Sequence, residues 1–437
     1  MESENEEDTC EHSDICKRNA KRGHDGKCIL HSEDPGKDEE TFEEAIKKHH
    51  RSHGPDFRKM VFPAGSMPFS EIEISFFAGV DREGVNCRGS TFLQQANFDD
   101  ATFIGGADFS TTTFQNQVSF GSATFEGPAR FSQTVFQSGA DFKDTEIRGE
   151  ADFRGAKFYN GEANFLAVTI TGKVYFYNLE LDQGLQAGGA ELEGGGVFAL
   201  SNLGGSDLRH ITLGENATLR FRGINLSECQ LVGTDLREAE FVDVKWCTEV
   251  SSDGWWFGEW FSRSGIYDEI LRSDSESQVS WEEVERSYRQ LKVRYEERGD
   301  FPRGGDFHIG EKVARRKSAW KNLRSEWGQW ALLGVYRAFS KYGERALPAA
   351  IWLAGLLLVC AVGYLSMGGM TDSVRLTSWR LQDWVGALVL SVEATLFPVQ
   401  SAGFHDIGPR ALNLLQRVIS PILIALFALA LRQRVKR

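Results

Sequence analysis

The fold is decided by the stretch ANFDDATFIGGADFSTTTFQNQVSFGSATFEGPARFSQTVFQSGADFKDTEIRGEADFRGAKF, which covers residues 96–158. A bulky apolar residue, usually Phe, returns after steps that alternate between five and six residues. A small or β-branched residue stands two positions before nearly every bulky one, as Ala96 does before Phe98. A short internal period of this kind indicates a solenoid whose repeats stack on their neighbours. The bulky series is Cys87, Phe92, Phe98, Phe103, Phe109, Phe114, Phe120, Phe125, Phe131, Phe136, Phe142, Ile147, Phe153 and Phe158.

These steps fit neither the 3.6-residue period of a helix nor the two-residue period of a flat strand. A chain that turns a corner after each step directs the bulky residue and the small residue before it into one core. Asn, Asp, Ser and Gly then occupy the corners. If four sides close one coil of about 22 residues and coils lie about 4.8 Å apart, the sequence predicts a β-helix of roughly seven coils.

The spacing changes along the repeats. One extra residue near 160–162 is expected to bulge outward, and glycines cluster between about 183 and 202, where the pattern weakens. The regular spacing of bulky residues resumes at Leu208. The steps then become strictly five residues through the last bulky positions, which are Phe221, Leu226, Leu231, Leu236, Phe241 and Trp246.

These repeats resemble the pentapeptide-repeat family, whose pattern is A-(D/N)-(L/F)-x-x. The resemblance implies a right-handed quadrilateral β-helix over residues 85–247, so the fold class is mainly β. The regular sixth residue departs from the family's strict repeat, and we therefore expect less square coils. Matching triplets begin at Ala96, Ala107, Ala140, Ala151, Ala163 and Thr234.

Residues 1–56 form a charged leader that ends in a helix-compatible run. Three thiolates and one imidazole make a closed tetrahedral shell for zinc, and so polar a leader needs such a staple to fold. The spacing C-x5-C-x11-C-x2-H predicts zinc as the only cofactor, with the ligands Cys10, Cys16, Cys28 and His31. The alternative is a disordered tail with free cysteines. Other histidines offer substitute ligands, namely His12, His24, His49, His50 and His53.

The segments that flank the repeats are expected to cover their ends. Residues 57–84 are predicted to form lead-in strands that cap the first edge. In residues 248–279 the aromatic cluster Trp255, Trp256, Phe257, Trp260 and Phe261 either plugs the last coil or docks at a membrane interface. Residues 280–319 are predicted to form an α-helical hairpin, with helices over 281–298 and 307–318.

A helical transmembrane module is predicted over residues 347–437. Residues 347–367 contain no charged side chain and are long enough to cross a ~30 Å hydrocarbon core, and 414–431 form a second span. A juxtamembrane helix over 320–346 carries Trp residues suited to the interface. Basic residues precede the first span and follow the second, so the positive-inside rule predicts that both termini are cytoplasmic.

Between the spans, residues 384–399 are apolar but contain Glu393 and Pro398. A third crossing would place the basic C-terminus outside, so a re-entrant helix is expected. This layout resembles the two-helix pore module of the potassium-channel superfamily, which bacterial and archaeal pentapeptide-repeat proteins carry at their C-terminus. The resemblance implies a multi-pass protein of the prokaryotic cell membrane and a homo-oligomer, tetrameric if it forms a pore.

The pore candidates are Glu393, Thr395 and Pro398. Glu393 is the one ionisable residue of the loop at the expected membrane depth, which makes it a candidate for an ion path. The alternative is that it pairs near the outer headgroups with Arg410. The TVGYG filter is absent, so the resemblance does not imply potassium selectivity.

Composition excludes several functions. The net charge is -13, and residues 85–246 carry 21 acidic against 12 basic side chains, so we expect no nucleic-acid partner. The seven cysteines suit a reducing cytosol, and the acidic first thirty residues are not a signal peptide. No catalytic triad, phosphate loop or metal-hydrolase spacing is present, so we expect that the protein is not an enzyme.

Three functions therefore remain. The first is an oligomeric, ion-channel-like protein whose cytoplasmic β-helix senses or docks a protein partner of unknown identity. The second is a non-conducting, membrane-tethered scaffold for protein–protein interactions. The third is a DNA mimic. Two observations make this function less suitable: the acidic excess is moderate, and a membrane tether opposes such a role.

Overall fold

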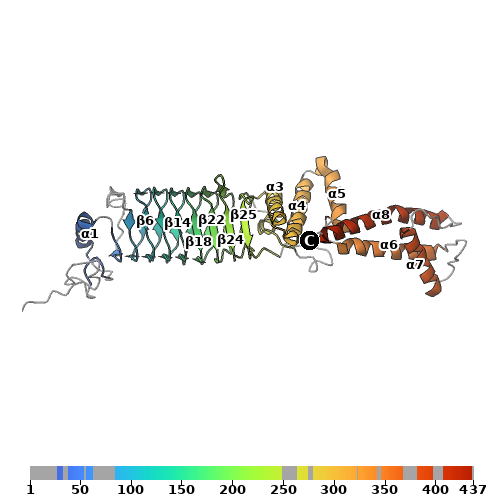
Figure 1. The fold of residues 1–437 in the computed structure, drawn as a ribbon, viewed down its shortest axis with the longest axis horizontal. Coiled ribbons are helices and arrows are strands. Elements are labelled where there is room, and N and C mark those ends of the chain that lie inside the picture. Colours follow the sequence, from blue (N-terminus) through green and yellow to red (C-terminus); the bar gives the residue numbers. More distant parts are fainter. Residues whose placement is uncertain are drawn as a thin grey trace, which may run out of the picture. The chain divides into compact units, whose positions relative to one another are not determined.

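The computed structural model describes eleven segments of the chain. The chain divides into two compact units, Met1–Arg294 and Tyr295–Arg437 (Figure 1). The described residues are 27–32, 38–53, 56–62, 84–248, 263–273, 279–321, 323–340, 342, 346–367, 381–396 and 407–435.

The first unit contains a β-solenoid of about seven turns built from parallel sheets, as the repeat period predicts (Figure 1). The strands that the structure describes fall into four sheets, one for each side of a coil. The first sheet contains β1 (Val61–Phe62), β3 (Thr91–Phe92), β7 (Thr113–Phe114), β11 (Val135–Phe136), β15 (Lys157–Phe158) and β19 (Glu180–Leu181). The second sheet contains β2 (Val85–Asn86), β6 (Ala107–Asp108), β10 (Ala129–Arg130), β14 (Ala151–Asp152), β18 (Val174–Tyr177), β22 (Gly196–Ala199), β24 (Leu219–Arg222) and β25 (Ala239–Val242).

The other two sheets have five and six strands. The third sheet contains β4 (Ala96–Asn97), β8 (Val118–Ser119), β12 (Ala140–Asp141), β16 (Ala163–Asn164) and β20 (Leu185–Gln186). The fourth contains β5 (Thr102–Phe103), β9 (Thr124–Phe125), β13 (Glu146–Ile147), β17 (Thr169–Ile170), β21 (Glu191–Leu192) and β23 (Thr212–Leu213).

The solenoid core consists of stacked phenylalanine rings. Phe98 lies over Phe120 with ring centroids 4.9 Å apart, and Phe120 lies over Phe142 at 5.0 Å. Their side chains are almost completely buried, as are the small residues two positions before them. The ring spacing matches the distance between hydrogen-bonded strands, so one repeat satisfies backbone pairing and ring stacking together.

The recurring geometry of the corners explains the A-(D/N)-F triplet. In the first full example, Asn97 Oδ1 accepts a hydrogen bond from the Asp99 amide at 2.8 Å, while the Ala101 amide donates to the Phe98 carbonyl at 3.2 Å. Asp100 has a φ of 58°, the left-handed conformation that such a turn requires. The same side-chain contact to the amide two residues later is made by Asp108, Asp141, Asp152, Asn164, Asp207, Asn225 and Asp235.

The strand-pairing register reflects the irregular spacing of the sequence repeats. Val118 pairs with Ala140, 22 positions later, whereas Ala140 pairs with Ala163, 23 positions later. The predicted extra residue is therefore confirmed. In the last pair of strands the offset is only 20, between Leu219 and Ala239, as strict five-residue steps require.

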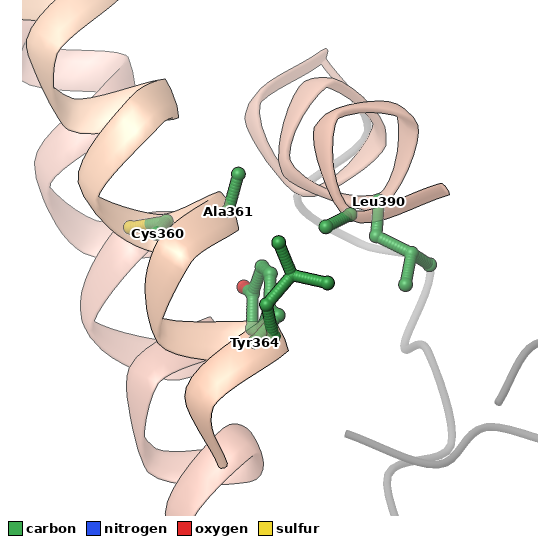
Figure 2. Close-up of a cluster of buried hydrophobic side chains, with 6 residues drawn as sticks. Cys360, Ala361, Tyr364 and Leu390 are labelled. Atoms are coloured by element: carbon green, nitrogen blue, oxygen red, sulfur yellow. The ribbon is translucent and has the colours of Figure 1, made fainter. Parts of the chain in front are cut away.

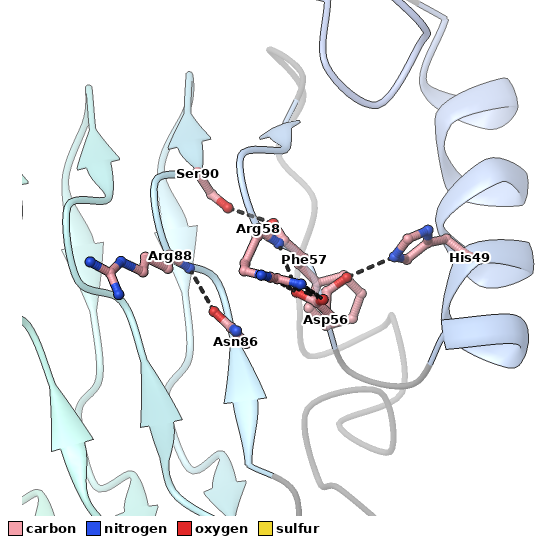
Figure 3. Close-up of polar contacts among 7 residues, drawn as sticks. All are labelled: His49, Asp56, Phe57, Arg58, Asn86, Arg88 and Ser90. Atoms are coloured by element: carbon pink, nitrogen blue, oxygen red, sulfur yellow. Dashed lines mark hydrogen bonds and ion pairs between the residues drawn. The ribbon is translucent and has the colours of Figure 1, made fainter. Parts of the chain in front are cut away.

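The first coil is covered by residues of the leader. Helix α1 (Glu39–His53) places the Phe42 ring 5.7 Å from Phe62, which in turn stacks on Phe92 at 4.3 Å. Figure 3 shows the polar contacts beside this apolar column, where His49 Nε2 lies 2.7 Å from the Asp56 carbonyl oxygen and Arg58 pairs with Asp56. The predicted lead-in strands between 63 and 83 lie outside the described residues.

Two helices satisfy backbone groups at the last coil. Helix α2 (Asp268–Ser273) begins with a carboxylate that accepts the amides of Leu231 at 2.8 Å and Val232 at 3.4 Å. From helix α3 (Trp281–Glu297), Gln290 accepts the Leu236 amide at 3.1 Å and Arg294 donates to the Ala239 carbonyl at 2.8 Å. The predicted aromatic plug, Trp255 to Phe261, lies outside the described residues.

The second unit is helical. Its helices are α4 (Phe301–Lys321), α5 (Leu323–Ser340), α6 (Ala346–Ser366), α7 (Leu381–Leu396) and α8 (Ile407–Val435). Helix α4 begins six residues before the predicted position 307. Pro302 stands in the first turn, where the missing amide costs nothing, and Asp300 Oδ1 accepts the Arg303 amide at 3.2 Å.

Two of these helices, Ala346–Ser366 and Ile407–Arg432, are long and apolar enough to cross a membrane, with mean hydropathies of 2.2 and 2.1. Both correspond to the predicted spans, although α8 begins earlier than residue 414. Helix α6 packs against α7 and α8, and α7 also contacts α8 (Figure 1). By length and composition, the second unit suggests association with a membrane.

The buried carboxylate of Asp268 predicts a pH dependence of stability. Burial raises its pKa from 3.8 to about 6, against the lowering effect of the Leu231 and Val232 amides. Since the folded-state pKa is the higher one, this contribution to stability is complete below about pH 4 and is lost as pH rises through about 6. Between pH 4 and 7, the free energy of unfolding of Asp268→Asn should therefore gain up to about 3 kcal/mol relative to the parent chain.

Urea unfolding of the full chain at several pH values measures this difference. Asp235→Asn is the matched control, because the Arg237 side chain lowers the pKa of Asp235 and the shift with pH should have the opposite sign. An unchanged difference between pH 4 and 7 for Asp268→Asn would contradict the prediction.

Candidate functional site

Helices α6 and α7 meet in an apolar cluster. Figure 2 shows Ala361 and Tyr364 of α6 on the side toward Leu390 of α7, while the Cys360 thiol, which belongs to the same cluster, points away from Leu390. Leu365 and Ala387 complete the cluster. The small residues let the two helices approach closely, as is usual for helices that pack within a membrane.

A polar network lies beside this cluster, with Gln416 of α8 at its centre. Tyr364 Oη donates to Gln416 Oε1 at 2.9 Å. Gln416 Nε2 lies 2.8 Å from Ser391 Oγ and 2.9 Å from Thr395 Oγ1. Asn413 Nδ2 donates to Tyr364 Oη at 3.3 Å. One fully buried amide thus ties all three helices together.

The network extends to the main chain. Gln416 Nε2 also donates to the Ser391 carbonyl at 2.7 Å, and Ser391 Oγ donates to the Leu357 carbonyl of α6 at 3.0 Å. In apolar surroundings an unpaired polar group is costly, so these contacts fix the position of α7 on α6 and α8.

Sequence reasoning missed this network. The signal was the spacing of Asn413, Gln416 and Ser420, which recur after three and four residues in a mainly apolar helix. Such spacing places them on one helix face. All three are buried in the structure.

The structure separates the predicted pore candidates. The side chain of Thr395 is buried and bonded to Gln416, whereas that of Glu393 is exposed. Two residues apart on a helix, they point about 200° away from one another, so they cannot line the same surface. The alternative pairing of Glu393 with Arg410 does not occur, although the structure describes both side chains. Pro398 lies outside the described residues.

The structure describes two of the four predicted zinc ligands. Cys28 Sγ and His31 Nδ1 lie 3.1 Å apart, and both side chains are buried. Cys10 and Cys16 lie outside the described residues. Within the part of the chain that is described, no group of three or more His, Cys, Asp or Glu side chains is arranged to hold a metal ion.

Part of the acidic charge on the solenoid surface is locally neutralised. Asp152, Asp207 and Asp235 each pair with an Arg two positions later, through Nε and Nη2 on the two carboxylate oxygens. Although burial opposes the shift, hydrogen bonds to the paired Arg lower the pKa of Asp207 and of Asp235. The paired carboxylates contribute less to any negative field than the charge count indicates.

Comparison with known proteins identifies the repeats. Residues 88–135 and 131–179 match the family model described as Pentapeptide repeats (9 copies). The chain carries a pentapeptide-repeat solenoid. This match covers about a fifth of the chain, whereas the stacked strands of the pentapeptide-repeat solenoid continue from β1 to β25. A search of curated proteins found no match to the chain.

The central role of Gln416 predicts the effect of removing it. Gln416→Leu leaves the Tyr364, Ser391 and Thr395 hydroxyls without their shared partner, so the packing of α7 should weaken by about 1–2 kcal/mol. Cys360 is a native reporter, because its thiol is buried beside Tyr364. Its rate of maleimide labelling in detergent, followed by mass spectrometry, should rise about tenfold for 1.4 kcal/mol.

Leu415→Ala is the matched control, because Leu415 is the exposed neighbour of Gln416 on the same helix. Equal labelling rates for Gln416→Leu and the control would show that the network does not hold α7 in place.

Proposed function

We propose that this pentapeptide-repeat protein is membrane-anchored, and that its second unit is one subunit of a homo-oligomeric, ion-channel-like assembly. The proposal is supported by two helices that can span a membrane, by a shorter apolar helix packed against both of them and by the exposure of one carboxylate on that shorter helix. The exposed Glu393 side chain is the observation on which the proposal chiefly depends.

Glu393 stands among apolar side chains on the outer surface of α7. Val389, Val392 and Leu396 are exposed around it. A carboxylate in contact with lipid tails is strongly disfavoured, so this surface requires water or a protein partner. A single subunit with two spans and one short helix cannot enclose an aqueous path, whereas several copies arranged around Glu393, four in a pore of the usual type, can.

The length of α7 supports a re-entrant arrangement. Its 16 residues extend over about 24 Å, which is short for a ~30 Å hydrocarbon core. A helix that returns to the side it entered leaves both termini on the same side of the cell membrane. The basic residues before α6 and at the end of α8 favour the cytoplasmic side.

In this arrangement the solenoid is a cytoplasmic sensing or docking part. Its Phe and Ala positions are buried and serve stability alone. Recognition of a protein partner would therefore use the outward positions of the strands and corners, where the unpaired acidic side chains lie.

The first test is conductance of the purified chain in planar bilayers. Wild-type protein should produce discrete cation currents. Glu393→Gln removes the charge at nearly constant shape and should lower the single-channel cation conductance several-fold. Asp383→Asn is the matched control, because Asp383 lies in the first turn of the same helix, and this variant should conduct nearly as the parent does.

A chain that inserts into bilayers but carries no current, and that remains a monomer in mild detergent, would overturn the channel. The same result would support a membrane-tethered scaffold.

The second test concerns topology. Green fluorescent protein fused after Arg437 should fluoresce in a bacterial host, because it folds in the cytoplasm, and so should the N-terminal fusion. If α7 crossed the membrane completely, the two fusions would report opposite sides, and the re-entrant arrangement would be excluded.

A further inference from the structure

The pair of helices α4 and α5 is basic, although the chain as a whole is acidic. Residues 311–340 carry seven basic and two acidic side chains, an excess of five positive charges within a chain of net charge -13. Three of the basic residues, Arg315, Arg316 and Lys317, are consecutive; the first side chain is exposed and the other two are half-buried. The acidic side chains of the pair are too few to neutralise it, so its surface favours an anionic partner.

Helix α5 also exposes a large apolar face. Trp327 is 68% exposed, Leu332 is 67% exposed and Val335 is 57% exposed. At about 100° per residue these three positions fall within about 140° of the helix circumference, so they belong to one face. Leu333 points to the opposite side and is buried. A face of this composition normally contacts a partner or a membrane.

The basic residues and the exposed aromatic side chains are neighbours. Arg316 stands four residues before Trp320 and therefore lies on the same face of α4. Trp320 is 57% exposed, and its ring centroid lies 5.2 Å from that of Trp330 in α5. Trp side chains next to basic residues are typical of the boundary between lipid headgroups and acyl chains.

Helix α5 is attached to the beginning of the first candidate span. The ring centroid of Phe339 lies 5.1 Å from that of Trp352, and Trp352 Nε1 donates to the Ala338 carbonyl at 3.0 Å. Trp352 lies six residues after Ala346, the first residue of α6, which is about 9 Å along the helix. The end of α5 therefore lies beside the part of α6 that would enter a bilayer.

This combination of features identifies the chemistry of the partner. A soluble anion would account for the basic residues but would leave the apolar face of α5 in water. A second copy of this chain would bring the same positive charge to the contact. An anionic phospholipid surface offers phosphate groups above acyl chains, and it is continuous with the bilayer that α6 would cross.

We infer that the pair of helices α4 and α5 binds anionic phospholipid headgroups of the leaflet at which α6 enters the membrane. Residues 315–317 contact the phosphates, and the apolar face of α5 lies at the boundary between headgroups and acyl chains. The inference rests on the membrane anchoring proposed above, but it does not depend on ion conduction.

The first measurement is lipid retention by the full chain. The chain is purified in mild detergent with equal amounts of phosphatidylglycerol and phosphatidylcholine, and bound lipids are counted by native mass spectrometry. Each basic side chain near an anionic surface contributes about a fivefold preference. We therefore expect about tenfold or greater retention of phosphatidylglycerol over phosphatidylcholine, and a smaller preference at high salt.

Charge variants test which residues carry this preference. Replacing Arg315, Arg316 and Lys317 together by Gln should reduce the preference to less than about twofold. The double variant Arg315→Lys/Arg316→Lys keeps the charge and should keep the preference. Arg222→Gln is the matched control, because Arg222 is an exposed arginine of the solenoid, and it should retain phosphatidylglycerol as the parent chain does.

Hydrogen exchange locates the contact. In phosphatidylcholine nanodiscs, the amides of residues 312–320 and 327–337 should exchange several-fold more slowly when phosphatidylglycerol replaces part of the lipid. Trp327→Ala should reduce this slowing in α5. Val359→Ala should not, although Val359 is exposed to the same extent as Trp327, because it lies on α6.

Three results would overturn the inference. One is equal retention of the two lipids by the parent chain, and another is an undiminished preference after all three basic residues are replaced by Gln. The third is displacement of phosphatidylglycerol by inorganic phosphate, with the same slowing of exchange in α4 alone, which would indicate a site for soluble anions.

Alkaline extraction separates this inference from the proposed anchoring. A chain that stays in phosphatidylcholine vesicles at high pH but shows no lipid preference would refute the inference and leave the anchoring intact. A chain that alkali removes, yet that floats with phosphatidylglycerol vesicles unless residues 315–317 are replaced, would support lipid binding and refute the spans.

Discussion

Each coil of the solenoid is stable only through the coil next to it. The two-residue strands are far too short to persist alone, and the rings of Phe98, Phe120 and Phe142 become buried only when successive coils stack. Complete burial of one Phe side chain contributes roughly 2–3 kcal/mol, and the amides of each coil donate to the carbonyls of the next. Stability is therefore distributed along the solenoid. Unfolding should begin at an end, where a coil lacks one of its two neighbouring coils.

The two ends solve this problem with different chemistry. At the last coil, Asp268, Gln290 and Arg294 bring charged or polar side chains from helices to main-chain groups that have no next coil. The cost is a carboxylate buried where water cannot solvate its charge. At the first coil, the main chain of the leader pairs directly with Val61 and Phe42 extends the phenylalanine column. This cover depends on the leader keeping one conformation.

The interactions that repeat were predictable from the sequence, and those that occur once were not. The eleven-residue period predicts strands, core and register, and even the inserted residue after Phe158 appears as an offset of 23 between Ala140 and Ala163. No period encodes the contact of Asp268 with Leu231 or of Gln416 with Ser391, because each joins segments far apart in sequence. The start of α4 was misjudged for a local reason. Pro302 normally ends helices, yet in the first turn it is tolerated.

The same distinction applies to the helices of the second unit. Sequence alone treated Glu393 and Thr395 as one pore-lining group, because both belong to the loop between the spans. The hydrogen bond from Gln416 to Thr395 fixes the rotation of α7, and a helix advances by about 100° per residue. Thr395 must then face α8, and Glu393 must face away from the subunit. The buried side chain of Thr395 thus decides which residue of α7 faces outward, since any rotation that brought Thr395 outward would bury the Glu393 carboxylate among apolar side chains.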